Sequence, residues 1–577
     1  MGEGLVTGRR PQTLNMIKKL LIANRGEIAI RIIRTATNLG IETVAVYSAD
    51  DAQSLHVFRA DQSVQLPGAG VSAYLDITEV VRAAAEQGCD ALHPGYGLLS
   101  ENPALARACD EAGLTFVGPA AASLERFGDK SAARKLAQEC EVPVLQGTDT
   151  ATSLEAARAF MLGLDARPII LKAVSGGGGR GVRPVHKLDE LESAFERSAS
   201  EAEKAFGNSD LYVEEYFAGA RHVEVQIIGD GNGQVIHLGE RDCSLQRRHQ
   251  KIVELAPAPN LTDALRTQLH EAAVSLAQAA NYSGAGTVEF LVHADRFAFI
   301  EANARLQVEH TVTEEVYDVD IVELQLRIAA GETLASLLPE PPSPRGRAVQ
   351  LRINTETMQA DGTTLPQAGE IKTFNPPFGP GIRLDTYVKP GYRTNASFDS
   401  MIAKLIVHSR STSLESLLAV AERALGEFQI SGVAHNIEFL KSLLQNHKVR
   451  DWQVHTQFID AHVSELLEQG DHPHYYDTQN EVVSVRQAGA SIDQSDPLAV
   501  LDYGQGRKAG QVDEALDESW LTSPMQGTIV EIQVAPGGQV LVGQTLLIMD
   551  SMKMEHEISA TSNGVVKQIS VSAGDVI

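Results

Sequence analysis

The N-terminal part of the chain alternates short apolar runs with amphipathic stretches. Residues 19–24 and Glu42–Tyr47 are each apolar at four positions and predict strands, and from Gly26 onward the stretch between them repeats its apolar positions at helical spacing. A second helical stretch near residues 78–87 precedes a short apolar run at residues 91–92. Strands that alternate with helices in this way predict a doubly wound α/β domain. No GxGxxG segment follows the first strand, so a dinucleotide site is not indicated.

The middle of the chain predicts two further regions. The first runs from about residue 128 to residue 341. Its expected strands lie at residues 168–173, 212–215 and 222–228, and a strand-turn-strand is expected at residues 287–301. The proline-rich segment at residues 339–346 predicts a joint between domains. A third region of helices and strands is expected from about residue 348 to residue 454.

The last part of the chain contains an internal repeat after a polar, acidic stretch at residues 464–517 that is typical of a linker. Residues 527–537 align with residues 564–574 at an offset of 37, and the apolar positions 529, 532 and 534 have partners at 566, 569 and 571. The repeat predicts two similar β halves joined by a turn at residues 550–555.

The second half of this repeat stops at Ile577, the residue that matches Val540, whereas the first half continues to Asp550. We therefore expect that about ten residues of a final strand are missing and that the chain is a piece of a longer protein. A missing strand would leave an unpaired sheet edge.

Composition narrows the class of protein. The net charge of −26 argues against a broad surface for nucleic acid or for an anionic membrane. The four cysteines lie far apart without ligand spacing, which is typical of a reduced protein without structural zinc. No apolar run approaches the roughly 20 residues of a membrane span, so we expect a cytoplasmic protein.

Lys553 lies at the predicted turn between the two β halves, within Asp-Ser-Met-Lys-Met-Glu. A lysine at a hairpin tip is well placed to carry a covalently attached, swinging group. The alternative is an ordinary surface lysine.

The glycine run at residues 175–181 follows the strand that carries Lys172. Consecutive glycines let backbone N–H groups approach phosphate oxygens, which indicates a nucleotide loop; the alternative is a flexible turn. It is not a Walker A loop, because no Lys-Ser/Thr pair ends it.

Glu289 and Glu301 fall on consecutive predicted strands. A three-residue turn at 294–296 would place them directly opposite each other, where two carboxylates repel unless a divalent cation lies between them. With Asn303 they form an oxygen-rich set suited to Mg²⁺, the alternative being a solvated hairpin face.

Arg305, Gln307 and Glu309 alternate along the next segment, so in extended geometry they project to one side. Arg305 is suited to bind a small oxyanion, and Glu309 is suited to act as a base beside it. A solvated strand edge is the alternative.

Six motifs occur in a fixed order: NRGEIA from Asn24, HPGYG from His93, GDK from Gly128, ERDCSLQRRHQK from Glu240, RLQVEH from Arg305 and FDSMI from Phe398. This order resembles the biotin carboxylase family of ATP-grasp enzymes from about residue 16 to residue 460. From residue 523 the chain resembles the biotin carboxyl carrier domain, and the methionines that flank Lys553 favour biotin over lipoate.

The resemblance implies a multidomain α/β fold. Its expected parts are a Rossmann-like pre-ATP-grasp domain (16–128), an ATP-grasp domain (129–341), an α+β C-terminal carboxylase domain (346–456), a linker (457–520) and an all-β hammerhead biotinyl domain (521–577).

The resemblance also assigns roles to individual residues. ATP contacts are implied for Lys130, Lys172, Gly176, Gly177, Gly178, Gly179, Glu214, His222, Gln246 and His249. Bicarbonate contacts are implied for Lys251, Arg305, Gln307 and Val308, and Mg²⁺ or Mn²⁺ contacts for Glu289, Glu301 and Asn303. Glu309 would be the base, Arg352 would steady the deprotonated biotin, and Lys553 would carry biotin covalently.

The implied activity is ATP-dependent carboxylation of biotin with bicarbonate through carboxyphosphate, the first half-reaction of an acetyl- or propionyl-CoA carboxylase. The alternative is the corresponding part of a pyruvate carboxylase or of a longer fused carboxylase. Three positions depart from the usual family pattern: Leu98, Ala304 and Thr311. Thr311 stands where acetyl-CoA carboxylases usually have proline, which leaves the final acceptor open.

The implied partners are a carboxyltransferase subunit or domain, a biotin protein ligase and a second copy of the carboxylase part. Two other hypotheses remain. One is a different ATP-grasp ligase, such as a carbamoyl-phosphate synthase relative, which has no use for Lys553. The other is a carrier or assembly subunit without activity.

Overall fold

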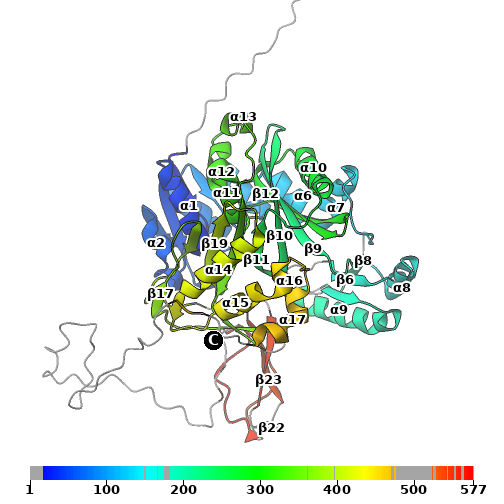
Figure 1. Ribbon diagram of the computed structural model, residues 1–577. Coiled ribbons are helices and arrows are strands. Elements are labelled where there is room, and N and C mark those ends of the chain that lie inside the picture. The colour runs from blue at the N-terminus through cyan, green and yellow to red at the C-terminus, as the bar shows by residue number, and fades with distance from the viewer. Residues whose placement is uncertain are drawn as a thin grey trace, which may run out of the picture. The chain divides into compact units, whose positions relative to one another are not determined.

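The structure is a computed structural model that falls into two units, Met1–Gly470 and Asp471–Ile577, each considered by itself (Figure 1). The described residues are 17–148, 151–165, 167–174, 182–206, 208–359, 362–395, 397–468, 473–475, 521, 523, 528–541, 544–551, 554–560 and 564–575. Within these residues, every helix is too short or too polar to cross a membrane.

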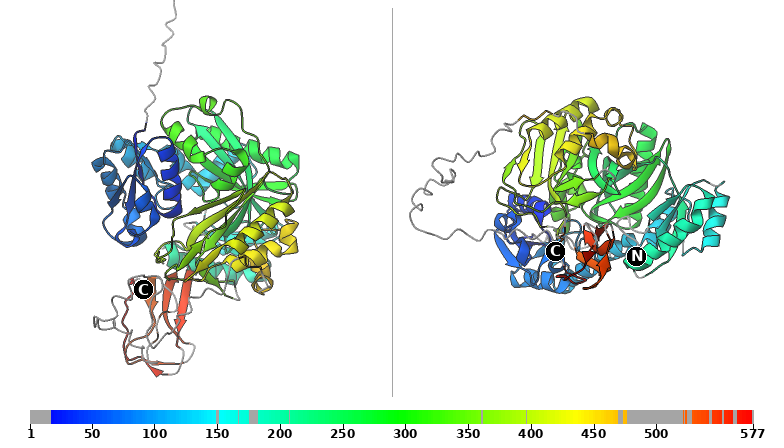
Figure 2. Two further views of the ribbon diagram at one scale, coloured as in Figure 1. Left: turned by 60° about the vertical axis from the view of Figure 1, so that its left-hand side comes forward. Right: turned by 90° about the horizontal axis from the view of Figure 1, so that it is seen from below.

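The first layer is a five-stranded parallel sheet in the order β3-β2-β1-β4-β5. Its strands are β1 (Lys19–Ile22), β2 (Glu42–Tyr47), β3 (Gln62–Gln65), β4 (Ala91–His93) and β5 (Thr115–Phe116). Its principal helices are α1 (Gly26–Asn38), α4 (Ile77–Glu86) and α5 (Pro103–Glu111). Helices stand on both sides of the strands, drawn in blue in the left view of Figure 2. The predicted doubly wound domain is confirmed.

Asn24 joins the two motifs that end neighbouring strands of this sheet. Its amide donates to the carbonyl oxygens of Pro94 (2.7 Å) and Tyr96 (2.8 Å). Gly95 between them has φ +65°, and a Cβ there would lie 2.8 Å from the Asn24 amide nitrogen. The close approach therefore requires glycine.

The second layer is an antiparallel eight-stranded sheet in the order β13-β12-β9-β10-β11-β14-β19-β18. Its strands are β9 (Arg221–Asp230), β10 (Val235–Arg247), β11 (Gln250–Ala256), β12 (Ser283–His293), β13 (Arg296–Asn303), β14 (Arg347–Asn354), β18 (Ile382–Thr386) and β19 (Met401–Ser409). Because β11 pairs with β14 from Val253↔Leu351 to Ala256↔Ala348, the sheet continues across the proline-rich segment. The segment at 339–346 therefore joins two halves of one sheet.

One face of this sheet is apolar and the other carries buried polar groups. In β9, Val223, Val225 and Ile227 pack in a core with helix α10 (Asp263–Ala279), while His222 and Glu224 alternate with them and are also buried. Since successive strand residues point to opposite faces, a fully buried strand with polar alternation marks a protected polar surface.

Helices cover other parts of the first unit. These are α2 (Leu55–Arg59), α3 (Gly70–Tyr74), α6 (Ala121–Gly128), α7 (Lys130–Glu139), α11 (His310–Tyr317), α12 (Ile321–Ala329), α13 (Leu334–Leu337), α14 (Leu414–Glu427), α15 (Ile437–Gln445), α16 (His447–Arg450) and α17 (Phe458–Leu467). Two small sheets pair β15 (Glu356–Met358) with β16 (Thr364–Pro366) and β17 (Thr373–Asn375) with β20 (Gln429–Ser431).

A separate three-stranded sheet has the order β7-β6-β8, with α8 (Leu154–Gly163) and α9 (Leu191–Phe206) beside it. Its strands are β6 (Ile169–Ala173), β7 (Val182–Val185) and β8 (Leu211–Glu215). The glycine run at residues 175–181 lies outside the described residues.

The second unit contains β21 (Thr528–Ile532), β22 (Gln539–Val540), β23 (Thr545–Ser551), β24 (Met554–Ser559) and β25 (Gly564–Val565). Three of these strands form a sheet in the order β21-β23-β24, and Ile529, Met549 and Ile558 on these strands form a small core. The β23–β24 pairing extends to Asp550↔Glu555 and Ser551↔Met554, so the outer residues of the turn predicted at 550–555 belong to the strands. Lys553 itself lies outside the described residues, and the missing final strand stays a prediction.

Candidate functional site

The centre of the polar face is the Lys251 ammonium group, whose side chain is 14% exposed. Its Nζ lies 2.6 Å from Glu224, 2.7 Å from Glu309 and 3.0 Å from Glu289. Burial alone would lower the pKa of Lys251, but these three carboxylates raise it well above its ordinary value. Lys251 is therefore a fixed positive charge.

A bulge in β11 brings Lys251 to this face together with Glu254. Pairing with β10 moves from Gln246↔Lys251 to Leu245↔Val253, so Ile252 is an extra residue on β11. Lys251 and Glu254, three positions apart, consequently share one face.

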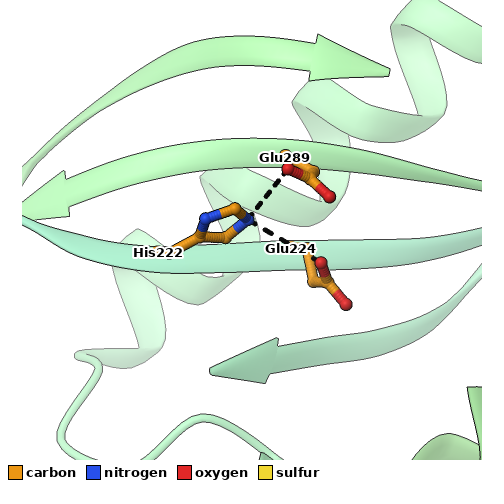
Figure 3. Close-up of side chains that lie close together, drawn as sticks. All are labelled: His222, Glu224 and Glu289. Atoms are coloured by element: carbon orange, nitrogen blue, oxygen red, sulfur yellow. Dashed lines mark ion pairs between the residues drawn. The ribbon is translucent and has the colours of Figure 1, made fainter. Parts of the chain in front are cut away.

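His222 lies beside two of these carboxylates, Glu224 and Glu289, as Figure 3 shows. Its Nε2 lies 3.0 Å from Glu289 and 3.8 Å from Glu224, and its Nδ1 lies 2.9 Å from the Gln246 amide. Burial opposes the charged ring, but Glu289 raises the pKa of His222 above its ordinary value. His222, Glu224 and Glu289 form one of two clusters among the described residues whose ligand atoms are close enough for one metal ion.

Glu289 pairs directly with Glu301 on the neighbouring strand, which confirms the expected juxtaposition. The expected three-residue turn is wrong. His293 pairs with Arg296, so the turn has two residues, and an irregularity between Glu289 and Phe290 restores the pairing with Glu301. One extra residue on β13 replaces the extra residue expected in the turn.

Glu289 gathers further polar groups, while Glu301 points elsewhere. Glu289 accepts hydrogen bonds from Asn303 (2.9 Å) and Gln307 (2.7 Å). The Glu301 carboxylate lies 3.9 Å from Lys130, the first residue of α7, and belongs to neither metal-compatible cluster. Partial burial and the nearby Glu289 raise the pKa of Glu301. The Glu289 and Glu301 carboxylates and the Asn303 side-chain oxygen are the hard oxygen donors that Mg²⁺ prefers.

Arg305, Gln307 and Glu309 do not form the extended segment expected from their alternation. The chain bends after β13 and turns into α11, with Glu309 at the helix start at φ −85° and ψ 6°. The His310 ring bonds the Gln307 carbonyl oxygen (2.7 Å) and holds this turn. Arg305 instead donates to Glu101 (2.9 Å) and Asn303 (3.0 Å).

Gln307 and Glu309 nevertheless meet at the centre of the polar face, since Gln307 reaches Glu289 and Glu309 reaches Lys251. The Val308 carbonyl oxygen accepts from the buried Lys404 (3.1 Å). Burial would raise the pKa of Glu309, but Lys251 and Arg352 lower it below its ordinary value. Glu309 is therefore a carboxylate at neutral pH.

Arg352 lies beside Glu309 and Glu254. Its Nη2 is 3.1 Å from Glu309, and its Nε is 2.5 Å from Glu254. Both carboxyl groups are almost completely buried, so the guanidinium is held between two acidic side chains of low exposure.

Glu214 links the residues expected to contact nucleotide. It accepts a short hydrogen bond from Lys172 and another from Arg134 (3.1 Å). His249 occupies the turn between β10 and β11 at φ +66°, and burial lowers its pKa. The predicted loop residues Gly176, Gly177, Gly178 and Gly179 lie outside the described residues.

Residue patterns alone did not single out Glu224, Arg241, Glu254 or Gln350. Arg241 is fully buried and donates to Glu224 (2.5 Å) and to Gln307 (2.9 Å). Glu224 and Gln350 lie on strands in which polar and apolar residues alternate, as in HVEVQ and VQLRI, whereas Arg241 and Glu254 do not. That alternation was a usable signal, but it is also the pattern of a solvated strand.

Four protein families match successive parts of the chain. They are described as biotin carboxylase, N-terminal domain (residues 16–124), carbamoyl-phosphate synthase L chain, ATP binding domain (129–337), biotin carboxylase C-terminal domain (350–461) and biotin-requiring enzyme (519–577).

Two curated relatives differ in how much of their length they share with this chain. The biotin-dependent acyl-coenzyme A carboxylase alpha3 subunit of Mycobacterium leprae is 39% identical over 587 residues, with 97% of each chain covered. The pyruvate carboxylase of Bacillus subtilis is 46% identical over 455 residues, which cover 77% of this chain and 39% of the relative.

Among solved structures, the biotin carboxylase domain of the Hydrogenobacter thermophilus 2-oxoglutarate carboxylase superposes with a TM-score of 0.73 at 39% identity. The match covers 78% of this chain and 99% of that one, and that structure is a dimer in complex with MgADP, ADP and bicarbonate.

Proposed function

Because the chain belongs to the family of biotin carboxylases that continue into a biotin carrier domain, we propose that it uses ATP to attach the carboxyl group of bicarbonate to biotin on Lys553. The observation that carries this proposal is the convergence of Lys251, Glu309 and Arg352 on one buried polar face.

The charges of this face suit an anionic substrate and a proton transfer. Lys251 and Arg305 supply fixed positive charge for bicarbonate. The Glu309 carboxylate accepts the proton that leaves the biotin nitrogen, and Arg352 holds that carboxylate in place while offering N–H donors to developing negative charge.

The residues of the chain fit two further groups, biotin and Mg²⁺. Biotin, when attached, supplies the ureido nitrogen that takes up the carboxyl group. The pairing of Ser551 with Met554 supports Lys553 as the attachment residue, because the two strands are joined by the segment that contains it. Glu289, Glu301 and Asn303 are the residues that would hold Mg²⁺ and thereby the phosphates of ATP.

Lys130, Lys172, Glu214, His222, Gln246 and His249 complete the proposal as the nucleotide contacts, with Gln307 and Val308 beside bicarbonate. Glu214 supports this assignment because it already holds the Lys172 ammonium group, which keeps a positive charge ready for phosphate.

Bicarbonate-stimulated ATP hydrolysis tests the activity. Purified, biotinylated protein should release ADP faster when bicarbonate is added, and a Lys553→Arg variant should lose most of that stimulation. A biotinylated protein whose ATP hydrolysis is indifferent to bicarbonate would overturn the proposal.

We propose an acyl-coenzyme A as the final acceptor, with acetyl- and propionyl-CoA as the first candidates. The support is that the Mycobacterium leprae subunit aligns over 97% of both chains, carrier included. Thr311 and the similarity to pyruvate carboxylase favour pyruvate as the second candidate. Either acceptor requires a carboxyltransferase partner, and a biotin protein ligase must load Lys553.

Adding each acceptor with a candidate carboxyltransferase discriminates between these two. Transfer of label from the carboxylated protein to propionyl- or acetyl-CoA would support an acyl-coenzyme A as the acceptor. Transfer of label to pyruvate alone would replace that proposal with pyruvate.

We also propose that the carboxylase part forms a dimer, by similarity to the dimeric 2-oxoglutarate carboxylase domain, and that the protein is cytoplasmic.

A further inference from the structure

Five side chains form a hydrogen-bonded ring that includes Arg352 and is here called the Arg352 ring: Thr311, Gln350, Glu254, Arg352 and Glu309. Thr311 donates its hydroxyl to Gln350 Oε1 (2.5 Å), and Gln350 Nε2 donates to Glu254 Oε2 (3.0 Å). Arg352 donates to Glu254 Oε1 (2.5 Å) and to Glu309 Oε2 (3.1 Å). Thr311 follows Glu309 by two residues at the start of α11, so the backbone closes the ring.

Strand register explains why these groups meet. Gln350 pairs with Glu254 across β11 and β14, and Gln350 and Arg352 are two positions apart on one face of β14. The β11 bulge at Ile252 brings Glu254 to that same face. Each contact therefore depends on backbone pairing as well as on side-chain reach.

The chemistry of the ring fixes the direction of each hydrogen bond. Gln350 donates its amide nitrogen to Glu254 Oε2, so the Gln350 amide oxygen faces Thr311. The Thr311 hydroxyl must be the donor. Thr311, Gln350 and Glu254 are each 0% exposed, so bulk water does not replace a lost partner.

We propose that Glu254, Gln350 and Thr311 are positioning residues that orient the Arg352 guanidinium for carboxylation, without touching substrate themselves. Among the described residues, Arg352 Nη1 has no hydrogen-bond partner, so the ring holds Nε and Nη2 and leaves Nη1 for the reacting groups. This inference rests on the proposed function, because that function gives Arg352 its task.

Two substitutions of Thr311 separate positioning from packing. Thr311→Val keeps the shape of the side chain and removes the donor, whereas Thr311→Ser keeps the donor and removes a methyl group. If Thr311 acts only by packing, the valine variant should be the better enzyme. If it acts through the ring, the serine variant should be the better one.

The measurement is ATP-dependent transfer of label from bicarbonate to the biotinylated full chain, with crystal structures of both variants as the readout independent of activity. We expect Thr311→Val to lower kcat about tenfold, as for other residues that support a reacting group, with KM for ATP within about twofold of wild type. Thr311→Ser should stay within about threefold of wild type in kcat. The valine structure should show Gln350 and Arg352 reoriented.

The outcomes distinguish this inference from the proposed function. If the wild-type protein is active and Thr311→Val is equally active, or if Arg352 has not moved in the Thr311→Val structure, the positioning inference is wrong and the proposed function is unaffected. A biotinylated wild-type protein that transfers no label would overturn the proposed function and this inference with it.

Discussion

At the scale of single residues, neighbouring opposite charges keep side chains ionised that burial alone would tend to neutralise. Glu309 is ionised because Lys251 and Arg352 flank it, and Lys251 is charged because three carboxylates surround it. The residue types and their order allowed the prediction of Lys251, Glu309 and Arg352 through family resemblance. The supporting Glu224 and Glu254 escaped notice, because nothing local in a strand shows which face is buried.

Replacing Glu309 by glutamine keeps its shape and removes the proposed base. We expect Glu309→Gln to lower biotin carboxylation by about a hundredfold or more, the usual contribution of a positioned acid or base. Label transfer from bicarbonate measures this. Glu139→Gln, which changes an exposed carboxylate on α7, is the matched control. A Glu309→Gln variant as active as this control would remove Glu309 from its role.

His56 makes the stability of the first unit depend on pH. Burial lowers the pKa of His56 from 6.5 to about 4. Between these two pH values His56 is neutral in the folded state and protonated in the unfolded state. Stability therefore falls as the pH falls from 6.5 toward 4, by about 1.4 kcal/mol for this group at one unit below 6.5. Melting temperatures at pH 7.5 and pH 5.5 should differ less for His56→Asn than for wild type; an equal or larger difference would contradict this assignment.

At the scale of elements, bulges decide which side chains meet. A short apolar run predicted β2. The pairing of Glu289 with Glu301 was predicted from a three-residue turn, and it is present although the turn has two residues, because β13 carries one extra residue. Periodicity did not predict the bulge at Ile252, because one extra apolar residue in a strand leaves no distinct mark in the hydrophobic pattern. The extended form expected for residues 305–309 was wrong because α11 begins directly after them.

Gly239 lies where pairing between β9 and β10 shifts register. Its φ is +66°, and a Cβ there would lie 2.2 Å from the Tyr317 hydroxyl oxygen; Gly88 has φ +65° with nothing within 4 Å. Both alanine variants incur backbone strain of about 1 kcal/mol, and Gly239→Ala adds a clash of about 1–3 kcal/mol. Thermal unfolding should show the larger loss for Gly239→Ala, and equal losses would refute the proposed clash.

At the scale of the whole chain, domain order was predictable from motif order, whereas the continuity of the central sheet was not. A proline-rich segment looks the same whether it joins two domains or two halves of one sheet. The pairing of β11 with β14 settles the matter, because Val253 and Leu255 face Leu351 and Val349 across the two halves.

This continuity predicts how truncated chains behave. A chain ending at residue 345 would expose the edge of β11 and its apolar neighbours, so we expect it to aggregate. A chain ending at residue 468 keeps the whole sheet and should give a monodisperse peak on size-exclusion chromatography with a cooperative melting transition. Well-folded behaviour of the shorter chain would contradict the single-sheet architecture.

The central claim is that this chain carboxylates its own biotin, and transfer of ¹⁴C from bicarbonate to the biotinylated protein tests it most directly. The account predicts acid-labile label on the protein that requires ATP and Mg²⁺ and disappears in Lys553→Arg. Absence of label on fully biotinylated wild-type protein, or label that persists in Lys553→Arg, would contradict it.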